Sequence, residues 1–172
     1  MSEKSTNFVA AIVSYRLQPG KNAKMKRADN PATAYQAWDL LYPWLGEKFT
    51  IPDERLPYEV VGAAVARSDI QSDGSLSLGS ALRHCSEKKG DELARDPVSA
   101  KLRRLLACSD KIEVCLVIRP FLSFIVSKGV SIKFASVLDD LVYFGDGTRV
   151  KTKWAADFYK GDNSDGGDAT DN

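Results

Sequence analysis

The stretch from residue 96 to residue 129, DPVSAKLRRLLACSDKIEVCLVIRPFLSFIVSKG, decides the fold. Asp96-Pro97 is typical of a helix start, because Asp caps free backbone amides and Pro tolerates the first helical position. The helix that starts there is predicted to run to Cys108 with four apolar residues facing inward: Val98, Leu102, Leu105 and Leu106. Ser109-Asp110 then predicts the cap of a long apolar helix over 112–128, kinked at Pro120 and ended by Gly129.

Working outward, apolar spacing and capping residues predict helices in most of the chain. No alternating strand pattern with turn signals occurs, so the expected fold class is all-α. Residues 46–57 contain Gly46, Pro52 and Pro57 and are predicted to be a loop, and residues 68–77 a polar linker. The other expected helices, with their signals, are a helix around Phe8–Val13 capped by Ser5 or Thr6, 22–28, 31–45 opened by Asn30-Pro31, 57–65 started by Pro57, 78–85, 131–144 capped by Ser131, and 149–159.

Charge patterning divides the chain further. Residues 86–96 (SEKKGDELARD) are charged and contain Gly90, which predicts a boundary between two small helical-bundle domains. The N-terminal helical domain is expected at 1–90, and an up-down four-helix bundle at 91–160. Residues 161–172 (GDNSDGGDATDN) carry four Asp and no cation, typical of a disordered acidic tail. Removing those four negative charges from the net +1 leaves +5 on residues 1–160.

Cysteine usage and hydropathy indicate a cytoplasmic protein. The three cysteines lack paired spacing, which argues against a disulfide framework. The N-terminus shows no signal-peptide pattern. The most apolar stretch, 114–126, is interrupted by Arg119 and Pro120 and is too short to span a bilayer.

The sequence offers no catalytic constellation. His84 is the only histidine, so zinc or triad chemistry has no partners at ligand spacing, and neither metal nor cofactor is expected. Asp139-Asp140 is the sharpest carboxylate pair, but adjacent helical residues point about 100° apart. We expect one of these two carboxylates to pair with Arg119, which is costly to bury alone in its apolar helix.

A basic pentapeptide occurs twice, as AKMKR at 23–27 and as AKLRR at 100–104. Each copy places three cations around one apolar anchor on a predicted helix, a pattern that suits phosphate. The alternative is a solvated helix face. For Trp38 and Trp154, base stacking is the weaker hypothesis, because both lie on apolar helix stripes. The candidate nucleic-acid-binding residues are Lys24, Lys26, Arg27, Lys101, Arg103, Arg104 and Arg119.

The chain resembles the CasB family, the small subunit of the type I-E CRISPR Cascade complex, over most of residues 7–161. No single motif is diagnostic, but the ordered set is. AKMKRAD (23–29) in the N-terminal half is less distinctive. The matching strings are SLGSAL (77–82), KLRRLLACSD (101–110), LVIRPFLSFI (116–125), GVSIKFASVLDDLVYF (129–144) and RVKTKWAADFYKG (149–161).

The resemblance implies a non-catalytic, all-helical subunit of a crRNA-guided antiviral complex. It implies two head-to-tail copies that contact the backbone subunits and stabilise target DNA and the displaced strand of the R-loop, with crRNA as a further possible contact. The family's basic positions fall on Lys26, Arg27, Arg103, Arg104 and Arg119, although Lys26 replaces what is often Arg. The alternative hypothesis is a helical protein–protein adaptor without direct nucleic-acid contact.

Overall fold

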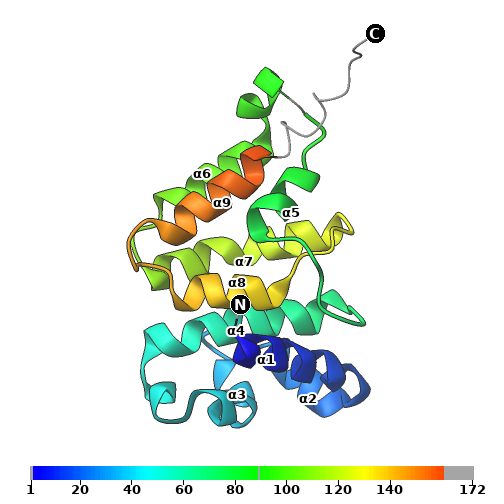
Figure 1. The fold of residues 1–172 in the computed structure, drawn as a ribbon. Helices are drawn as coiled ribbons and strands as arrows, with labels where there is room; N and C mark the ends of the chain where they lie inside the picture. Colours follow the sequence, from blue (N-terminus) through cyan, green and yellow to red (C-terminus); the bar gives the residue numbers. More distant parts are fainter. Residues whose placement is uncertain (1, 89, 161–172) are drawn as a thin grey trace.

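The computed structural model describes residues 2–88 and 90–160, and within them the protein is all-α, as predicted (Figure 1). Within these residues, Leu76 and Ile132 form an isolated parallel β-bridge. Four short 3-10 helices connect or extend the main helices: η1 (Tyr15–Leu17), η2 (Ala34–Ala37), η3 (Gly46–Thr50) and η4 (Gly90–Arg95). The α-helices are α1 (Glu3–Ser14), α2 (Pro19–Met25), α3 (Trp38–Leu45), α4 (Pro52–Ser68), α5 (Leu78–His84), α6 (Pro97–Ala107), α7 (Lys111–Ser127), α8 (Phe134–Val142) and α9 (Arg149–Tyr159).

Helix α4 lies at the centre of the molecule. Figure 1 shows α1, α2 and α3 on one side of it and α7 and α8 on the other, with α5, α6 and α9 beyond them. Ten consecutive residues of α4, from Pro57 to Ala66, are buried, since helices cover it on several sides. One continuous apolar core therefore reaches from Phe8 in α1 to Trp154 in α9.

Helices α6, α7 and α9 match the predicted segments. The side chain of Asp96 caps α6 at the amide of Val98, and that of Asp110 caps α7 at the amide of Glu113. The prediction for α4 is wrong at its start: the helix begins at Pro52 and Pro57 lies inside it. Pro52 occupies the first position of the helix, which proline favours because its missing N–H is not needed there. Pro57 sits only one turn further on, where it costs a single backbone hydrogen bond.

The predicted Ser131 cap of α8 is also wrong. The helix begins at Phe134, and its amides are capped from another part of the chain. The carboxylate of Asp73 accepts hydrogen bonds from the amides of Phe134 (2.7 Å) and Ala135 (3.1 Å). The segment between α4 and α5 thus does more than link them, because it fixes the N-terminus of α8.

The helix predicted over 31–45 is divided in the structure. Turns at 31–33 and η2 precede α3, which starts only at Trp38. The boundary predicted near residue 90 stays a prediction; α4 packs on α7 and α8 across it, and α5 packs on α9. The predicted acidic tail, 161–172, lies outside the described residues.

The closest approach between α5 and α9 depends on Gly79. A Cβ atom at this position would overlap the carbonyl oxygen of Trp154 and lie 2.9 Å from Cβ of Asp157. We expect Gly79→Ala to lower the free energy of unfolding by about 2–3 kcal/mol, because the two helices must separate. Chemical denaturation followed by circular dichroism measures this. Gly20→Ala is the control: no atom lies within 4 Å of its added Cβ, and the free energy of unfolding should not fall.

Candidate nucleic-acid interface

A buried carboxylate, Asp29, joins three segments that are distant in the sequence. It follows the first basic pentapeptide and accepts two hydrogen bonds from Arg67 at the end of α4, at 2.9 and 2.5 Å. Nε of Arg119 in α7 lies 3.3 Å from Asp29 Oδ2. Arg67 also donates to the carbonyl of Lys26 at 2.9 Å. One anion thus orients two guanidinium groups. We call the three side chains Asp29, Arg67 and Arg119 the Asp29 junction; together they carry a net charge of +1.

The prediction that Asp139 or Asp140 pairs with Arg119 is wrong. Asp140 contacts Lys153 and Trp154, and Asp139 accepts hydrogen bonds from Ser2 and Ser5. Arg119 instead leaves α7 on the side of α4, where Asp29 is near. The reason for the prediction still holds: Arg119 is partly buried and has an anionic partner. The sequence alone did not indicate which carboxylate this partner is.

The first basic pentapeptide has its apolar anchor buried and its cations outside. Met25 is fully buried, which fixes the segment on the core. Lys24 pairs with Asp39 at 2.8 Å, so its charge is already balanced. Arg27 Nη1 donates to the neutral amide oxygen of Gln36, Oε1, at 3.1 Å, and Lys26 is exposed. Lys26 and Arg27 therefore lie beside Asp29 with their charges facing solvent, whereas the charge of the equally exposed Lys24 is balanced by Asp39.

The second pentapeptide has the same design. Leu102 is fully buried, and the cations project from α6. Lys101 Nζ lies 4.7 Å from the ring centre of Phe124 in α7, and Lys128 Nζ lies 5.8 Å from the same ring. Arg103 Nη1 donates to the carbonyl of Ala94 at 3.2 Å, while Arg104 is exposed. The Phe124 ring thus brings Lys101 and Lys128 together.

The exposed face of α7 connects the two pentapeptides. Ser123 and Ser127 follow Arg119 at helical spacing, and both line a groove of about 170 Å³ with Arg67. From Arg119 to Lys128 the helix rises about 14 Å. No acidic residue occurs between Val114 and Gly129. We call this surface the basic track; it consists of Lys26, Arg27, Arg67, Arg119, Ser123, Ser127, Lys128 and Lys101.

The track includes four of the seven candidate residues: Lys26, Arg27, Lys101 and Arg119. Arg103 and Arg104 lie on α6 but outside the basic track, and Lys24 is paired with Asp39. Sequence reasoning missed Arg67 and its anchor Asp29 as parts of the site. Asp29 is visible in the string AKMKRAD, but its arginine partners lie 38 and 90 residues away.

The three cysteine thiols are not activated as nucleophiles. Burial raises the pKa of all three thiols, most for Cys115, to about 12. Each thiol is therefore protonated at neutral pH, the less reactive form. In the described part of the chain, no three His, Cys, Asp or Glu side chains are grouped as metal ligands. Within the same residues, no helix combines the length and apolarity that a membrane crossing needs.

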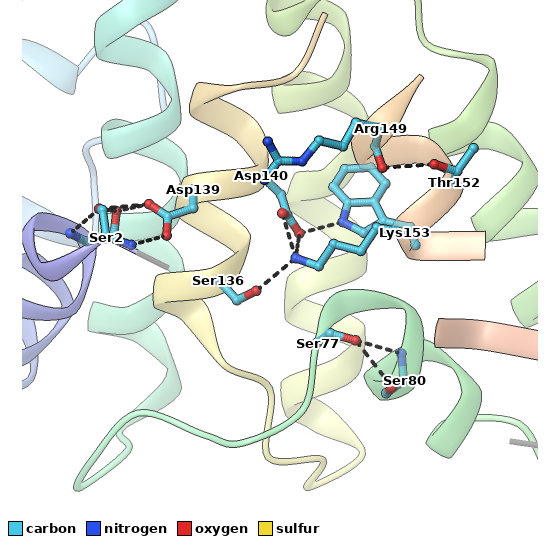
Figure 2. A network of polar contacts seen from close by, with 11 residues as sticks. Ser2, Ser77, Ser80, Ser136, Asp139, Asp140, Arg149, Thr152 and Lys153 are labelled. Atoms are coloured by element: carbon cyan, nitrogen blue, oxygen red, sulfur yellow. Dashed lines mark hydrogen bonds and ion pairs between the residues drawn. The ribbon is translucent and has the colours of Figure 1, made fainter. Parts of the chain in front are cut away.

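A larger cavity, about 780 Å³, lies elsewhere, between the start of α1, α8 and α9. Figure 2 shows Asp139 pointing to Ser2 and Asp140 pointing to Lys153. Both carboxylates already accept hydrogen bonds, and Asp140 also accepts one from the buried indole of Trp154 at 2.8 Å. These contacts hold α1 and α9 on α8, so the cleft has a structural role.

Neutralising the Asp29 junction should weaken the fold. We expect Asp29→Asn to lower the free energy of unfolding by about 1–2 kcal/mol, because two charge-assisted contacts lose their anion while the arginines stay partly hydrated. Thermal unfolding measures this. Asp39→Asn is the matched control, since it removes only the exposed pair with Lys24 and should cost less than about 0.5 kcal/mol. Equal effects of the two variants would contradict the structural role of Asp29.

Comparison with known proteins identifies the sequence family. Residues 21–159 match the family model described as CRISPR-associated protein Cse2. No curated protein sequence matches the chain significantly. Among solved structures, a CRISPR-associated protein of the Cse2 family from Thermus thermophilus is 21% identical with a TM-score of 0.71, covering 93% of this chain and 99% of the other.

Two further structures have the same fold. CasB from Thermus thermophilus is 21% identical with a TM-score of 0.72, over 93% of this chain and 99% of that protein. A chain of a structure described as a CRISPR RNA-guided surveillance complex is 15% identical, with a TM-score of 0.74 and 92% of each chain covered. At these identities the likeness establishes the fold.

Proposed function

Since the chain belongs to the CRISPR-associated Cse2 family, we propose that it is a non-catalytic subunit of a CRISPR RNA-guided surveillance complex. In that complex it holds single-stranded nucleic acid along the basic track. The observation that supports nucleic-acid binding is the Asp29 junction, which brings Arg67 and Arg119 beside the first pentapeptide.

The track is suited to a phosphodiester backbone. Guanidinium groups held by Asp29 are oriented before binding, so less side-chain entropy is lost when phosphate is contacted. Serine hydroxyls between the cations are further donors to phosphate oxygens. Such contacts fix a strand without reading its sequence.

The ligand is the target DNA or the displaced strand of the R-loop. R-loop formation is a near-balanced exchange of duplexes, so modest contacts to one strand shift the equilibrium. The body of the protein carries only +5 on residues 1–160, which suits a subunit whose binding is completed by neighbours. Those neighbours are the other subunits, the crRNA and a second copy of this chain, in the cytoplasm.

A protein–protein adaptor is the second candidate. The exposed apolar side chains favour it, above all Leu17, which is 80% exposed, and Tyr42. In this alternative the cations of the track are only solvated.

Salt-dependent binding distinguishes the two functions. We expect labelled single-stranded DNA to bind with a log–log salt slope of up to about −4, since six cations at about 0.7 each can be engaged. Fluorescence anisotropy at several salt concentrations measures the slope. A methylphosphonate strand of the same sequence has no backbone charge and is the matched control. Equal binding of both strands, or of neither, would favour the adaptor.

A further inference from the structure

Beside the Asp29 junction lies a small pocket of about 240 Å³ that the basic track does not use. It opens between the segment before α3 and the two helices α4 and α7. Its apolar walls are Pro31, Ala34, Trp38, Leu56 and Leu116. Leu116 and Trp38 are partly exposed and so form its rim, whereas two carboxylates at its floor, Asp29 and Glu59, are each 6% exposed. The pocket is thus apolar around its entrance and polar at its base.

Glu59 keeps one oxygen free for a ligand. Its Oε1 accepts hydrogen bonds from Trp38 Nε1 at 3.1 Å and from Arg55 Nε at 2.9 Å. Its Oε2 accepts none from any residue in the described ranges 2–88 and 90–160. The side chain of Glu59 is largely buried, but solvent reaches Oε2 through the pocket, so this oxygen can accept a hydrogen bond from a ligand donor. Arg55 lies 5.1 Å from the Trp38 ring centre and holds the indole in place.

The charges around the pocket select the kind of donor. The ionised groups nearest to it are Asp29, Glu59, Arg55, Arg67 and Arg119, which sum to +1. A cationic side chain from a partner would enter a site whose anions are already paired. A neutral group with N–H donors and an aromatic face meets the free oxygen and the indole without a charge penalty.

We propose that this pocket binds an unpaired nucleobase that carries an exocyclic amino group, from the strand whose phosphates lie on the basic track. The inference rests on the proposed function and goes beyond it, because the track alone reads no base. Arg119 follows Leu116 by three residues, so α7 rises only about 4.5 Å between the pocket rim and the phosphate site. The amino group donates to Glu59 Oε2, and the base contacts Trp38 and Leu116.

Three labelled strands of equal length test the proposal by anisotropy: oligodeoxycytidine, oligothymidine and an abasic strand. All three carry the same phosphates. We expect the cytosine strand to bind about tenfold more tightly than the abasic strand, the effect of one stacked base. Thymine presents O4 as an acceptor where cytosine presents an amino donor, so oligothymidine should bind about threefold less tightly than oligodeoxycytidine.

Two variants of the chain probe the two contacts. Glu59→Gln replaces the free oxygen with an amide donor and should reverse the preference toward thymine. Leu116→Trp blocks the rim and should reduce binding of the cytosine strand to that of the abasic strand. Ile112→Trp is the matched control, because Ile112 is exposed on the same helix one turn away and does not line the pocket. If Glu59→Gln fails to fold by circular dichroism, the exposed Leu116 variant still decides.

The outcomes separate this inference from the proposed function. Equal, salt-dependent binding of the three strands would overturn the base pocket and leave the basic track standing; a partner's side chain would then be the pocket's occupant. An unchanged cytosine preference in Leu116→Trp would also overturn it. No binding of any strand would refute the pocket together with the track.

Discussion

Reversing two charges at either end of the basic track is expected to weaken single-stranded DNA binding by more than tenfold at low salt. The variants are Lys26→Glu/Arg27→Glu at one end and Lys101→Glu/Lys128→Glu, beside the Phe124 ring, at the other. Each lost phosphate contact lowers the log–log salt slope by about 0.7, so each pair should lower it by about 1.4. Preference among sequences should not change, because these residues contact phosphates. The fold should survive, since the apolar anchors Met25 and Leu102 stay buried in the core and none of the four substituted side chains is buried.

The matched control is Arg149→Glu/Lys160→Glu. This pair makes the same change in net charge at two exposed positions on and after α9, outside the basic track. It should leave the salt slope close to the wild-type value. If both double variants are folded by circular dichroism and keep wild-type affinity, the cations are a solvated face. If the control weakens binding equally, only the net charge matters and no track exists.

Removing the carboxylate of Asp140 should produce the largest loss of stability. We expect Asp140→Ala to lower the free energy of unfolding by about 3 kcal/mol, because the fully buried Trp154 loses the acceptor of its Nε1–H and Lys153 loses its anion (Figure 2). In a protein of this size, that corresponds to a fall in Tm of about 6–12 °C.

Two companion variants resolve the contributions to this loss. Asp140→Asn retains an acceptor for the indole and should recover about half of the stability. Asp146→Ala removes an exposed carboxylate that lines the same cleft and should change the free energy of unfolding by less than about 0.5 kcal/mol. A loss below about 1 kcal/mol for Asp140→Ala would show that the Trp154 contact is not structural.

Local signals in the sequence were enough to predict the fold class and several helices. Asp96 and Asp110 cap their own helices within three residues, so α6 and α7 follow from neighbouring residues. The start of α8 does not, because its cap comes from Asp73, about sixty residues earlier. Pro57 was misread for a related reason: burial of α4 by its neighbours outweighs the cost of a proline in its second turn.

The candidate site was predictable only in part. The pentapeptides reveal cations around buried anchors, and the anchors Met25 and Leu102 are indeed buried. The junction that orients Arg119 depends on two tertiary contacts: the segment after α2 packs on α4, which brings Asp29 to Arg67, and α4 packs on α7, which brings Arg119 to Asp29. A one-dimensional pattern cannot show which carboxylate a partly buried arginine reaches when all candidates lie on other segments of the chain.

Photo-crosslinking from Ser123 tests whether single-stranded DNA lies along the basic track. Ser123 is exposed at the middle of the basic track, between Arg119 and Lys128, and a benzoylphenylalanine there projects from α7. We expect a crosslink to bound single-stranded DNA that disappears in Lys26→Glu/Arg27→Glu. The same probe at Tyr143, which is exposed at the cleft beside α8, should give none. A bound strand that crosslinks to Tyr143 and leaves Ser123 unlabelled would show that the strand does not follow the basic track.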